Sequence, residues 1–120
     1  MNSDLPVLQK VNDAYKVWHE LLPGVPRLTR YSLGEKINWL FIELIELILM
    51  AAYSSRDQKS EIIQKASIKL DMLKYFLQIA WELKAMDNKQ LGRISPPLVE
   101  VGKMLGGWKK QVVTETPPNK

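Results

Sequence analysis

The fold class is decided by residues 57–86, DQKSEIIQKASIKLDMLKYFLQIAWELKAM, a stretch that contains neither proline nor glycine. Apolar residues recur in it at alternating spacings of three and four, which is the pattern of an α-helix that packs along one stripe. This core stripe contains Ile63, Ala66, Leu70, Leu73, Leu77 and Ala80. The spacing therefore predicts one long helix from Asp57 to Met86.

A second apolar stripe lies beside the first on the same predicted helix. It contains Ile68, Met72, Phe76, Ile79, Leu83 and Met86, and the first five are the predicted oligomer interface. A bundle helix needs only one stripe to face its own core. The second stripe thus predicts contact with another subunit, although a wide core face explains it equally well.

Two further helices are predicted before this one. The first is predicted to have Asp4 as its N-cap, Pro6 in its first turn and apolar residues from Val7 to Leu22. It ends at Pro23–Pro26, because this proline- and glycine-containing turn cannot continue a helix. The second is predicted to open at Ser32, since Ser32–Glu35 has the S-x-x-E spacing of a capping box. It continues to Ala52 and leaves only a narrow polar strip, so it must be covered on most sides.

A fourth helix is predicted after the polar residues Asp87–Ile94. Ser95 is placed as its N-cap and Pro96 in its first turn, where the missing N–H costs little. Its apolar residues repeat the three–four spacing: Leu98, Val101, Leu105, Trp108 and Val112. Residues 114–120 are expected to form a disordered tail. Residues 1–113 are therefore predicted to be all-α, as an antiparallel up-down four-helix bundle.

Composition narrows the class of protein further. The chain has 120 residues, a net charge of +4 and no cysteine, which excludes disulfides, thiolate metal ligands and a cysteine nucleophile. The longest apolar stretch, Trp39–Tyr53, is shorter than the roughly 20 residues of a membrane span and contains two glutamates. The N-terminus lacks the pattern of a signal peptide. We expect a cytoplasmic protein without a membrane partner.

The sequence offers little for catalysis. His19 is the single histidine, and no nucleophile motif accompanies it. Glu43 and Glu46 share a helix face, but a di-metal site in a bundle needs Glu-x-x-His pairs, which are absent. These glutamates are expected at a polar edge or in pairs with basic residues across an interface. We expect no enzymatic activity, no metal, no cofactor and no small-molecule substrate.

Glycines stand at unusual positions in the last predicted helix. Gly102 and Gly106 are one turn apart, and glycine inside a helix costs about 1 kcal/mol relative to alanine. Close approach of another helix backbone or of a bulky ring would explain them, and a partner-docking groove is the alternative. The predicted helix-packing motif comprises Gly102, Leu105, Gly106, Gly107 and Trp108.

The excess positive charge lies entirely in the second half of the chain. Residues 61–120 hold ten basic and six acidic residues, whereas residues 1–60 hold seven of each. Basic residues that share one surface can neutralise phosphates, whereas scattered lysines only form a solvated face. Aromatic residues do not interleave with them in the manner of single-strand binders. The candidate nucleic-acid-binding residues are Lys65, Lys69, Lys74, Arg93, Lys103, Lys109 and Lys110.

Three segments resemble the Avd family, the accessory variability determinants of diversity-generating retroelements. They are Arg30–Ile37 (RYSLGEKI), Ala66–Lys74 (ASIKLDMLK) and Val101–Trp108 (VGKMLGGW). The last segment is the most specific, because paired glycines before a tryptophan are unusual within a helix. The resemblance extends over roughly residues 5–113.

This resemblance implies a four-helix bundle that assembles into a barrel-like homopentamer. It also implies binding to the retroelement reverse transcriptase and to RNA or DNA, in support of mutagenic copying. Of two functional basic positions on the third helix of the family, one matches Lys74 and the other falls on the neutral Gln78. The related bundles encoded in ribosomal RNA intervening sequences carry an Asn-Ile-Ala-Glu-Gly type motif where this chain has Leu47–Ala51. We therefore favour Avd, with a structural or interaction bundle that binds no nucleic acid as the alternative.

Overall fold

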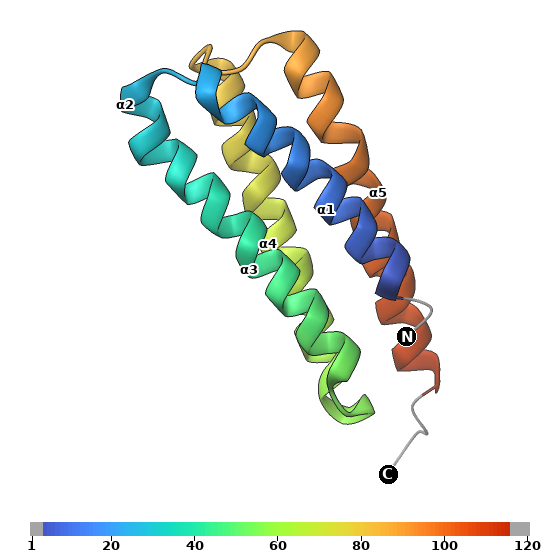
Figure 1. The fold of residues 1–120 in the computed structure, drawn as a ribbon. Coiled ribbons are helices and arrows are strands. Elements are labelled where there is room, and N and C mark those ends of the chain that lie inside the picture. The colour runs from blue at the N-terminus through green and yellow to red at the C-terminus, as the bar shows by residue number, and fades with distance from the viewer. Residues whose placement is uncertain (1–3, 116–120) are drawn as a thin grey trace.

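Four long helices dominate the computed structural model, which describes residues 4–115 of the chain and the side chains of residues 6–114 (Figure 1). The prediction of an all-α fold is confirmed. The long helices are α1 (Asp4–Leu21), α3 (Glu35–Tyr53), α4 (Arg56–Glu82) and α5 (Asn88–Glu115). Short helical turns link α1 to α3: η1 (Leu22–Gly24), α2 (Arg27–Thr29) and the π-helical η2 (Arg30–Gly34).

The long helices form an elongated bundle that measures 53 × 22 × 20 Å. In Figure 1 they lie side by side, and the chain reverses its direction at each connection. The most extensive contacts join α3 to α4, α1 to α5 and α4 to α5, and a smaller contact joins α1 to α3. Each long helix therefore has two long-helix neighbours, and one side of it remains for solvent or for a partner.

The core stripe predicted on α4 is confirmed. All six of its residues are buried, and none exposes more than 2% of its surface. The predicted apolar stripe of the last helix is also buried, together with Val7, Val11, Ala14 and Trp18 of α1 and Ile37, Leu40, Phe41, Leu44 and Ile48 of α3. The largest of these side chains contribute about 1.5–3 kcal/mol each on burial, so this single apolar cluster stabilises the bundle.

The predicted helix start at Ser32 is wrong. Helical structure already begins at Arg27, directly after Pro26, and Ser32 lies within the π-helical turn. Its hydroxyl donates to the backbone carbonyls of Leu28 and Thr29 at 3.0 and 3.3 Å, instead of accepting from a free N–H as an N-cap does. The S-x-x-E spacing is therefore coincidental here, because the preceding turn already supplies the hydrogen bonds that a cap would replace.

The predicted end of α4 at Met86 is also wrong, because the helix stops at Glu82. Lys84 adopts a left-handed conformation with φ = 62°. The N–H groups of Lys84 and Ala85 donate to the carbonyls of Trp81 and Ala80, each at 2.9 Å. These two bonds form a Schellman motif with a lysine where glycine is usual, and this turn reverses the chain four residues earlier than predicted.

Ser95 is not the N-cap of the last helix, which already begins at Asn88. The N–H of Gln90 donates to Asp87 Oδ1 at 2.7 Å, and the N–H of Asp87 donates to Gln90 Oε1 at 2.9 Å. This reciprocal pair is a capping box built from Asp and Gln. Pro96 and Pro97 consequently lie inside α5, where each ring removes an intrahelical hydrogen bond.

The last helix extends further than predicted. α5 continues to Glu115, so Thr114 is helical, and residues 116–120 of the expected tail lie outside the described residues. None of the helices within residues 4–115 is long and apolar enough to cross a membrane.

Candidate nucleic-acid interface and subunit face

The three candidate lysines of α4 do not share one face of that helix. Lys69 Nζ lies 3.0 Å from Glu43 Oε1, so Lys69 faces α3. Lys65 is four residues earlier and lies on the same flank, where it is 3.9 Å from Glu61. Lys74 is on the opposite flank and lines a shallow groove with Ser95 and Val99 of α5. The predicted basic patch on α4 is thus divided between two sides of the bundle.

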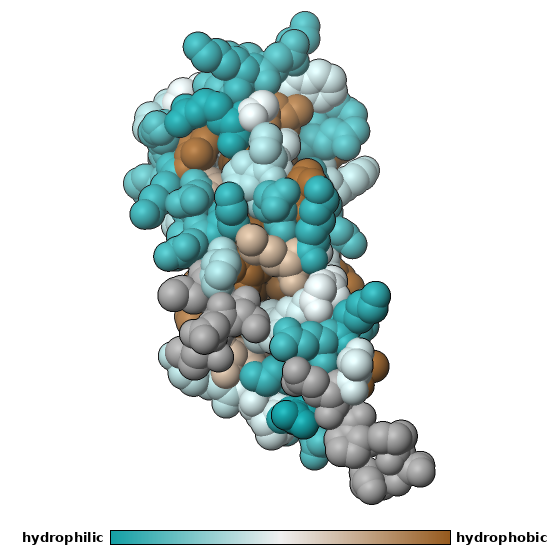
Figure 2. Space-filling model, turned by 90° about the vertical axis from the view of Figure 1, so that its right-hand side faces the viewer, coloured by the Kyte–Doolittle hydropathy of each residue, from teal (hydrophilic) through white to brown (hydrophobic). Residues whose placement is uncertain are grey.

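The basic residues of α5 are divided in the same way. Arg93 faces α1, where its guanidinium donates to Glu20 Oε2 at 2.9 Å. Lys109 faces α4 and donates to Gln64 Oε1. Lys103 and Lys110 are seven residues apart, almost in line on the exposed outer face of α5. Figure 2 looks onto the side of the molecule that α5 forms, and this side is largely hydrophilic.

The structure therefore brings together four of the seven candidates, Lys74, Lys103, Lys109 and Lys110, along α5 and its seam with α4. Lys65, Lys69 and Arg93 lie elsewhere. Gln78, the neutral residue at a basic family position, lines the same seam as Lys74 and donates to Glu82 Oε2 at 3.2 Å. Its amide hydrogen-bonds to a carboxylate and adds no charge to the seam.

The second apolar stripe of α4 is partly covered within this chain, and Met86, its last predicted member, is only 4% exposed. Ile68 is 50% exposed and Leu83 is 62% exposed. Met72, Phe76 and Ile79 are half-buried, and Met72 and Phe76 touch the edge of the core. A single protomer therefore leaves much of this stripe in contact with water, and burial by another subunit remains a prediction.

Sequence reasoning missed that α3 also exposes apolar residues. Trp39 and Met50 are each more than half exposed, and Tyr53 is exposed at the end of the helix. The narrow polar strip of α3 was the available signal, because so apolar a helix has more apolar surface than two neighbours can cover. Glu43, part of that strip, pairs with Lys69 of the same chain, as an intramolecular bridge.

The glycines of α5 differ in their surroundings. A Cβ at Gly102 would lie 3.4 Å from Leu70 Cδ2 of α4, whereas a Cβ at Gly106 or Gly107 would meet nothing within 4 Å. Leu105 and Trp108 are core residues. Helix packing within this chain therefore explains Gly102 alone, and two exposed helical glycines are left with no contact that needs them.

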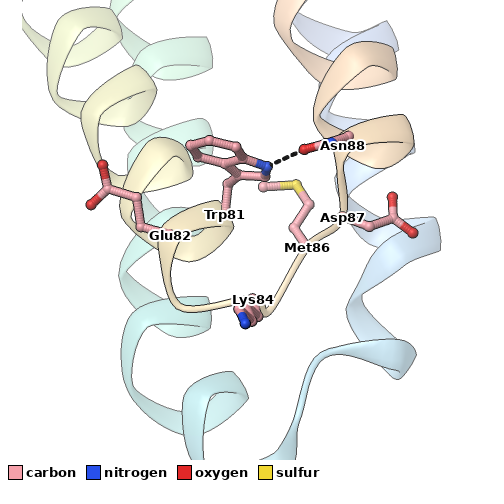
Figure 3. Close-up of a pocket in the computed structure, with 6 residues that line it drawn as sticks. All are labelled: Trp81, Glu82, Lys84, Met86, Asp87 and Asn88. Atoms are coloured by element: carbon pink, nitrogen blue, oxygen red, sulfur yellow. Dashed lines mark hydrogen bonds between the residues drawn. The ribbon is translucent and has the colours of Figure 1, made fainter.

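A pocket at the turn between α4 and α5 is shown in Figure 3. Trp81 Nε1 donates to Asn88 Oδ1 at 2.6 Å, and Met86 lies between the two helix ends beside the indole. Glu82, Lys84 and Asp87 point outward from its rim. The hydrogen bond ties the end of α4 to the start of α5, so this pocket is a structural joint.

A second group that sequence reasoning missed lies around the π-helical turn. Arg30, Tyr31, Asn38 and Trp39 line a pocket there, together with Leu22, Gly34 and Glu35. The Arg30 guanidinium donates to the Val25 carbonyl at 3.1 Å and holds the turn in place. The available signal was the RYSLGEKINW segment, in which Arg30 and Tyr31 are adjacent and Trp39 follows two helical turns later.

The described part of the chain is thus a helical bundle that exposes both basic and apolar side chains. In this part, no group of three or more His, Cys, Asp or Glu side chains could hold a metal ion. A family model described as bAvd-like matches residues 5–112. The chain therefore belongs to the bAvd-like family, and the predicted resemblance to Avd is confirmed. This is a family of retroelement accessory proteins and is not known as an enzyme family. No curated protein matches the chain.

Proposed function

We propose that this protein is the accessory protein of a diversity-generating retroelement, that it binds the reverse transcriptase, and that it binds template RNA or complementary DNA during mutagenic copying in the cytoplasm. The observation that carries this proposal is the family match over residues 5–112. Its surfaces are suited to binding large partners, because basic and apolar side chains are exposed along the lengths of the helices.

The proposal includes assembly of an antiparallel four-helix bundle into a homopentamer. The exposed stripe of Ile68, Met72, Phe76, Ile79 and Leu83 supports it, because oligomers bury contiguous apolar surface between subunits. Assembly also multiplies the charge, since five copies of a +4 chain carry +20. A modest basic bias in one protomer thereby becomes a strong field for polyanions.

Within each protomer, the seam and outer face of α5 are the proposed nucleic-acid surface, through Lys74, Lys103, Lys109 and Lys110. Lys65, Lys69 and Arg93 would contribute mainly through the summed field of the assembly, because they lie on other sides of the bundle than these four lysines. Electrostatic binding of this kind has low sequence specificity and a steep dependence on salt.

Titration of a 20-nucleotide single-stranded RNA at several salt concentrations tests this proposal. Removing two phosphate contacts should make the negative slope of log K against log salt less steep by about 1.4, since each contact contributes about 0.7 for a single strand. The test variant is Lys109→Gln with Lys110→Gln, and the matched control is Lys10→Gln with Lys16→Gln on α1. A wild-type affinity that does not change with salt, or equal slopes for both double variants, would refute the proposed surface.

A second candidate function is a structural or interaction bundle without nucleic-acid binding. The observation that favours it is that five of the seven candidate basic residues lie within 4 Å of a carboxylate in the same chain, as in the pairs of Lys69 with Glu43 and Arg93 with Glu20. The RNA titration separates the two functions. A reverse transcriptase gene with paired template and variable repeats beside this gene would favour the retroelement role.

A further inference from the structure

The size and the backbone of the pocket at the π-helical turn are those of a ligand site. Its volume is about 400 Å³, within the usual range for ligand pockets, about 300–1,000 Å³. Its wall is the π-helical turn Arg30–Gly34. Such turns are rare in proteins, and those that occur are often found at functional sites. Gly34 is buried where the turn passes Leu22, and a Cβ there would lie 3.4 Å from the Thr29 carbonyl oxygen. The turn is therefore closely packed at Gly34, whereas its pocket side is open to solvent.

The π-helical turn brings two aromatic rings to the same pocket. Tyr31 and Trp39 are eight residues apart, a separation of about 80° around a regular α-helix at 100° per residue. A π turn closes with hydrogen bonds that reach five residues, so it winds less per residue and reduces this angle. Tyr31 is 60% exposed and Trp39 is 58% exposed. Both rings thus present a large apolar surface to whatever occupies the pocket.

Positive charge surrounds these rings. The Arg27 guanidinium lies 5.9 Å from the centre of the Tyr31 ring, and Arg30 lines the pocket while it holds the preceding turn. Glu35 is the one acidic residue among those that line the pocket. Two guanidinium groups therefore stand near one carboxylate. Guanidinium groups beside exposed aromatic rings, with a net positive charge, suit a polyanion that carries flat apolar groups.

The floor of the pocket also offers a polar group at a fixed position. The Tyr15 hydroxyl donates to Asn38 Oδ1 at 2.8 Å. This bond orients the side-chain amide and keeps its oxygen occupied, so its nitrogen is the group that can donate to a ligand. An amide donor beside aromatic faces is suited to the edge of a nucleobase, whose carbonyl oxygens and ring nitrogens accept hydrogen bonds.

We propose that Tyr31 and Trp39 form a stacking site for unpaired bases of a single RNA or DNA strand, whose phosphates Arg27 and Arg30 contact. The inference rests on the proposed nucleic-acid binding and adds base stacking to it, an interaction that charge alone does not provide. Proteins that bind single strands combine a basic track with aromatic rings on which bases stack. Base-paired nucleic acid cannot use this site, because its bases already stack on one another. The protein should therefore distinguish unpaired template from duplex.

The experiment compares strands of equal charge that differ in their bases. Fluorescence anisotropy of labelled U20, dT20, an abasic 20-mer and a 20-base-pair duplex is measured with the full chain and with Tyr31→Leu and Trp39→Leu. Each variant should bind U20 or dT20 about 10-fold more weakly, which is about 1.4 kcal/mol and within the range for one stacked base. Affinity for the abasic strand and for the duplex should change less than twofold, and the ratio of U20 to dT20 identifies the preferred strand.

Two controls keep the outcomes distinct. Tyr53→Leu removes a more exposed tyrosine, 76% against 60% for Tyr31, from the far end of α3 and should leave all affinities unchanged. Trp39→Phe should retain binding but reduce the tryptophan quenching by U20, because Trp39 is 58% exposed, against 38% for Trp81 and at most 8% for Trp18 and Trp108.

Salt-dependent binding of U20 by the wild type, with unchanged affinity in Tyr31→Leu and Trp39→Leu, would overturn the stacking site and leave the proposed function intact. No wild-type binding to any strand would overturn both. A fall in oligomer mass caused by Trp39→Leu would assign the ring to a subunit contact and overturn the stacking site.

Discussion

Replacing the exposed glycines of α5 should stabilise the protein. Gly106 and Gly107 lie in the interior of a helix, and a Cβ at either position would meet no atom within 4 Å. Glycine in such a position costs about 0.8–1.0 kcal/mol relative to alanine, because the unfolded chain loses more conformational freedom on folding. The double variant Gly106→Ala with Gly107→Ala should therefore gain about 1.5–2 kcal/mol in free energy of unfolding.

The gain should be visible as a higher melting temperature. At about 4 °C per kcal/mol for a domain of this size, the double variant should melt about 6–8 °C above the wild type. Urea unfolding monitored by circular dichroism gives the free energy directly, and an unchanged m-value shows that the folded state is the same. Gly102→Ala is the internal comparison, and it should gain less, because its Cβ would lie 3.4 Å from Leu70 Cδ2.

A double variant no more stable than the wild type would refute this reasoning, because it would mean that the glycine face is covered in the folded protein. The same variant also tests the docking alternative for the predicted helix-packing motif. If a partner helix approaches these glycines, the double variant should keep its higher stability and bind the reverse transcriptase more weakly in a pull-down.

Two further predictions concern the turn between α4 and α5. Lys84→Gly should raise the free energy of unfolding by about 1 kcal/mol in urea titrations, because a left-handed conformation costs a residue with a Cβ roughly 1–2 kcal/mol; a loss of stability would contradict the left-handed turn. Asp87→Ala should lower it by about 1 kcal/mol, because the Gln90 N–H loses its cap, whereas Ser95→Ala should change it by less than half as much. Equal losses from Asp87→Ala and Ser95→Ala would contradict α5 starting at Asn88.

The core of this fold was predictable from the period of its apolar residues. The alternation of three and four from Ile63 to Ala80 placed six residues in the core, and all six are buried. That period persists because one face of a long helix must meet the interior over its whole length. A pattern with many repeats also tolerates single exceptions, so this segment could be predicted as an α-helix.

The helix ends were less predictable, because short motifs there compete. Ser32–Glu35 and Ser95–Pro97 both match N-terminal signatures, yet each lies inside helical structure. Asp87 and Gln90 form the cap that is used, although Asp-x-x-Gln is a weaker signature than Ser-x-x-Glu or than serine followed by proline. Lys84 occupies a left-handed position without the glycine that would have marked it.

The candidate site was only partly predictable, because spacing along a helix does not say which neighbour lies on each flank. Lys65, Lys69 and Lys74 are close in sequence, but Lys69 contacts α3 and Lys74 lines the seam with α5. The pocket lined by Arg30, Tyr31 and Trp39 depends on the π-helical turn, and no residue pattern in RYSLGEKI predicts that turn. The basic and aromatic residues were visible, but their shared pocket was not.

The central claim, that the open apolar stripe of α4 lies between copies of this chain in a basic oligomer, is tested most directly by solution mass. Light scattering after size exclusion, at low and at high salt, should give about five times the 13.8 kDa of one chain. Ile68→Lys, a change at an exposed position that should leave the protomer folded, should reduce that mass. A wild-type mass of 13.8 kDa at both salt concentrations would contradict the claim.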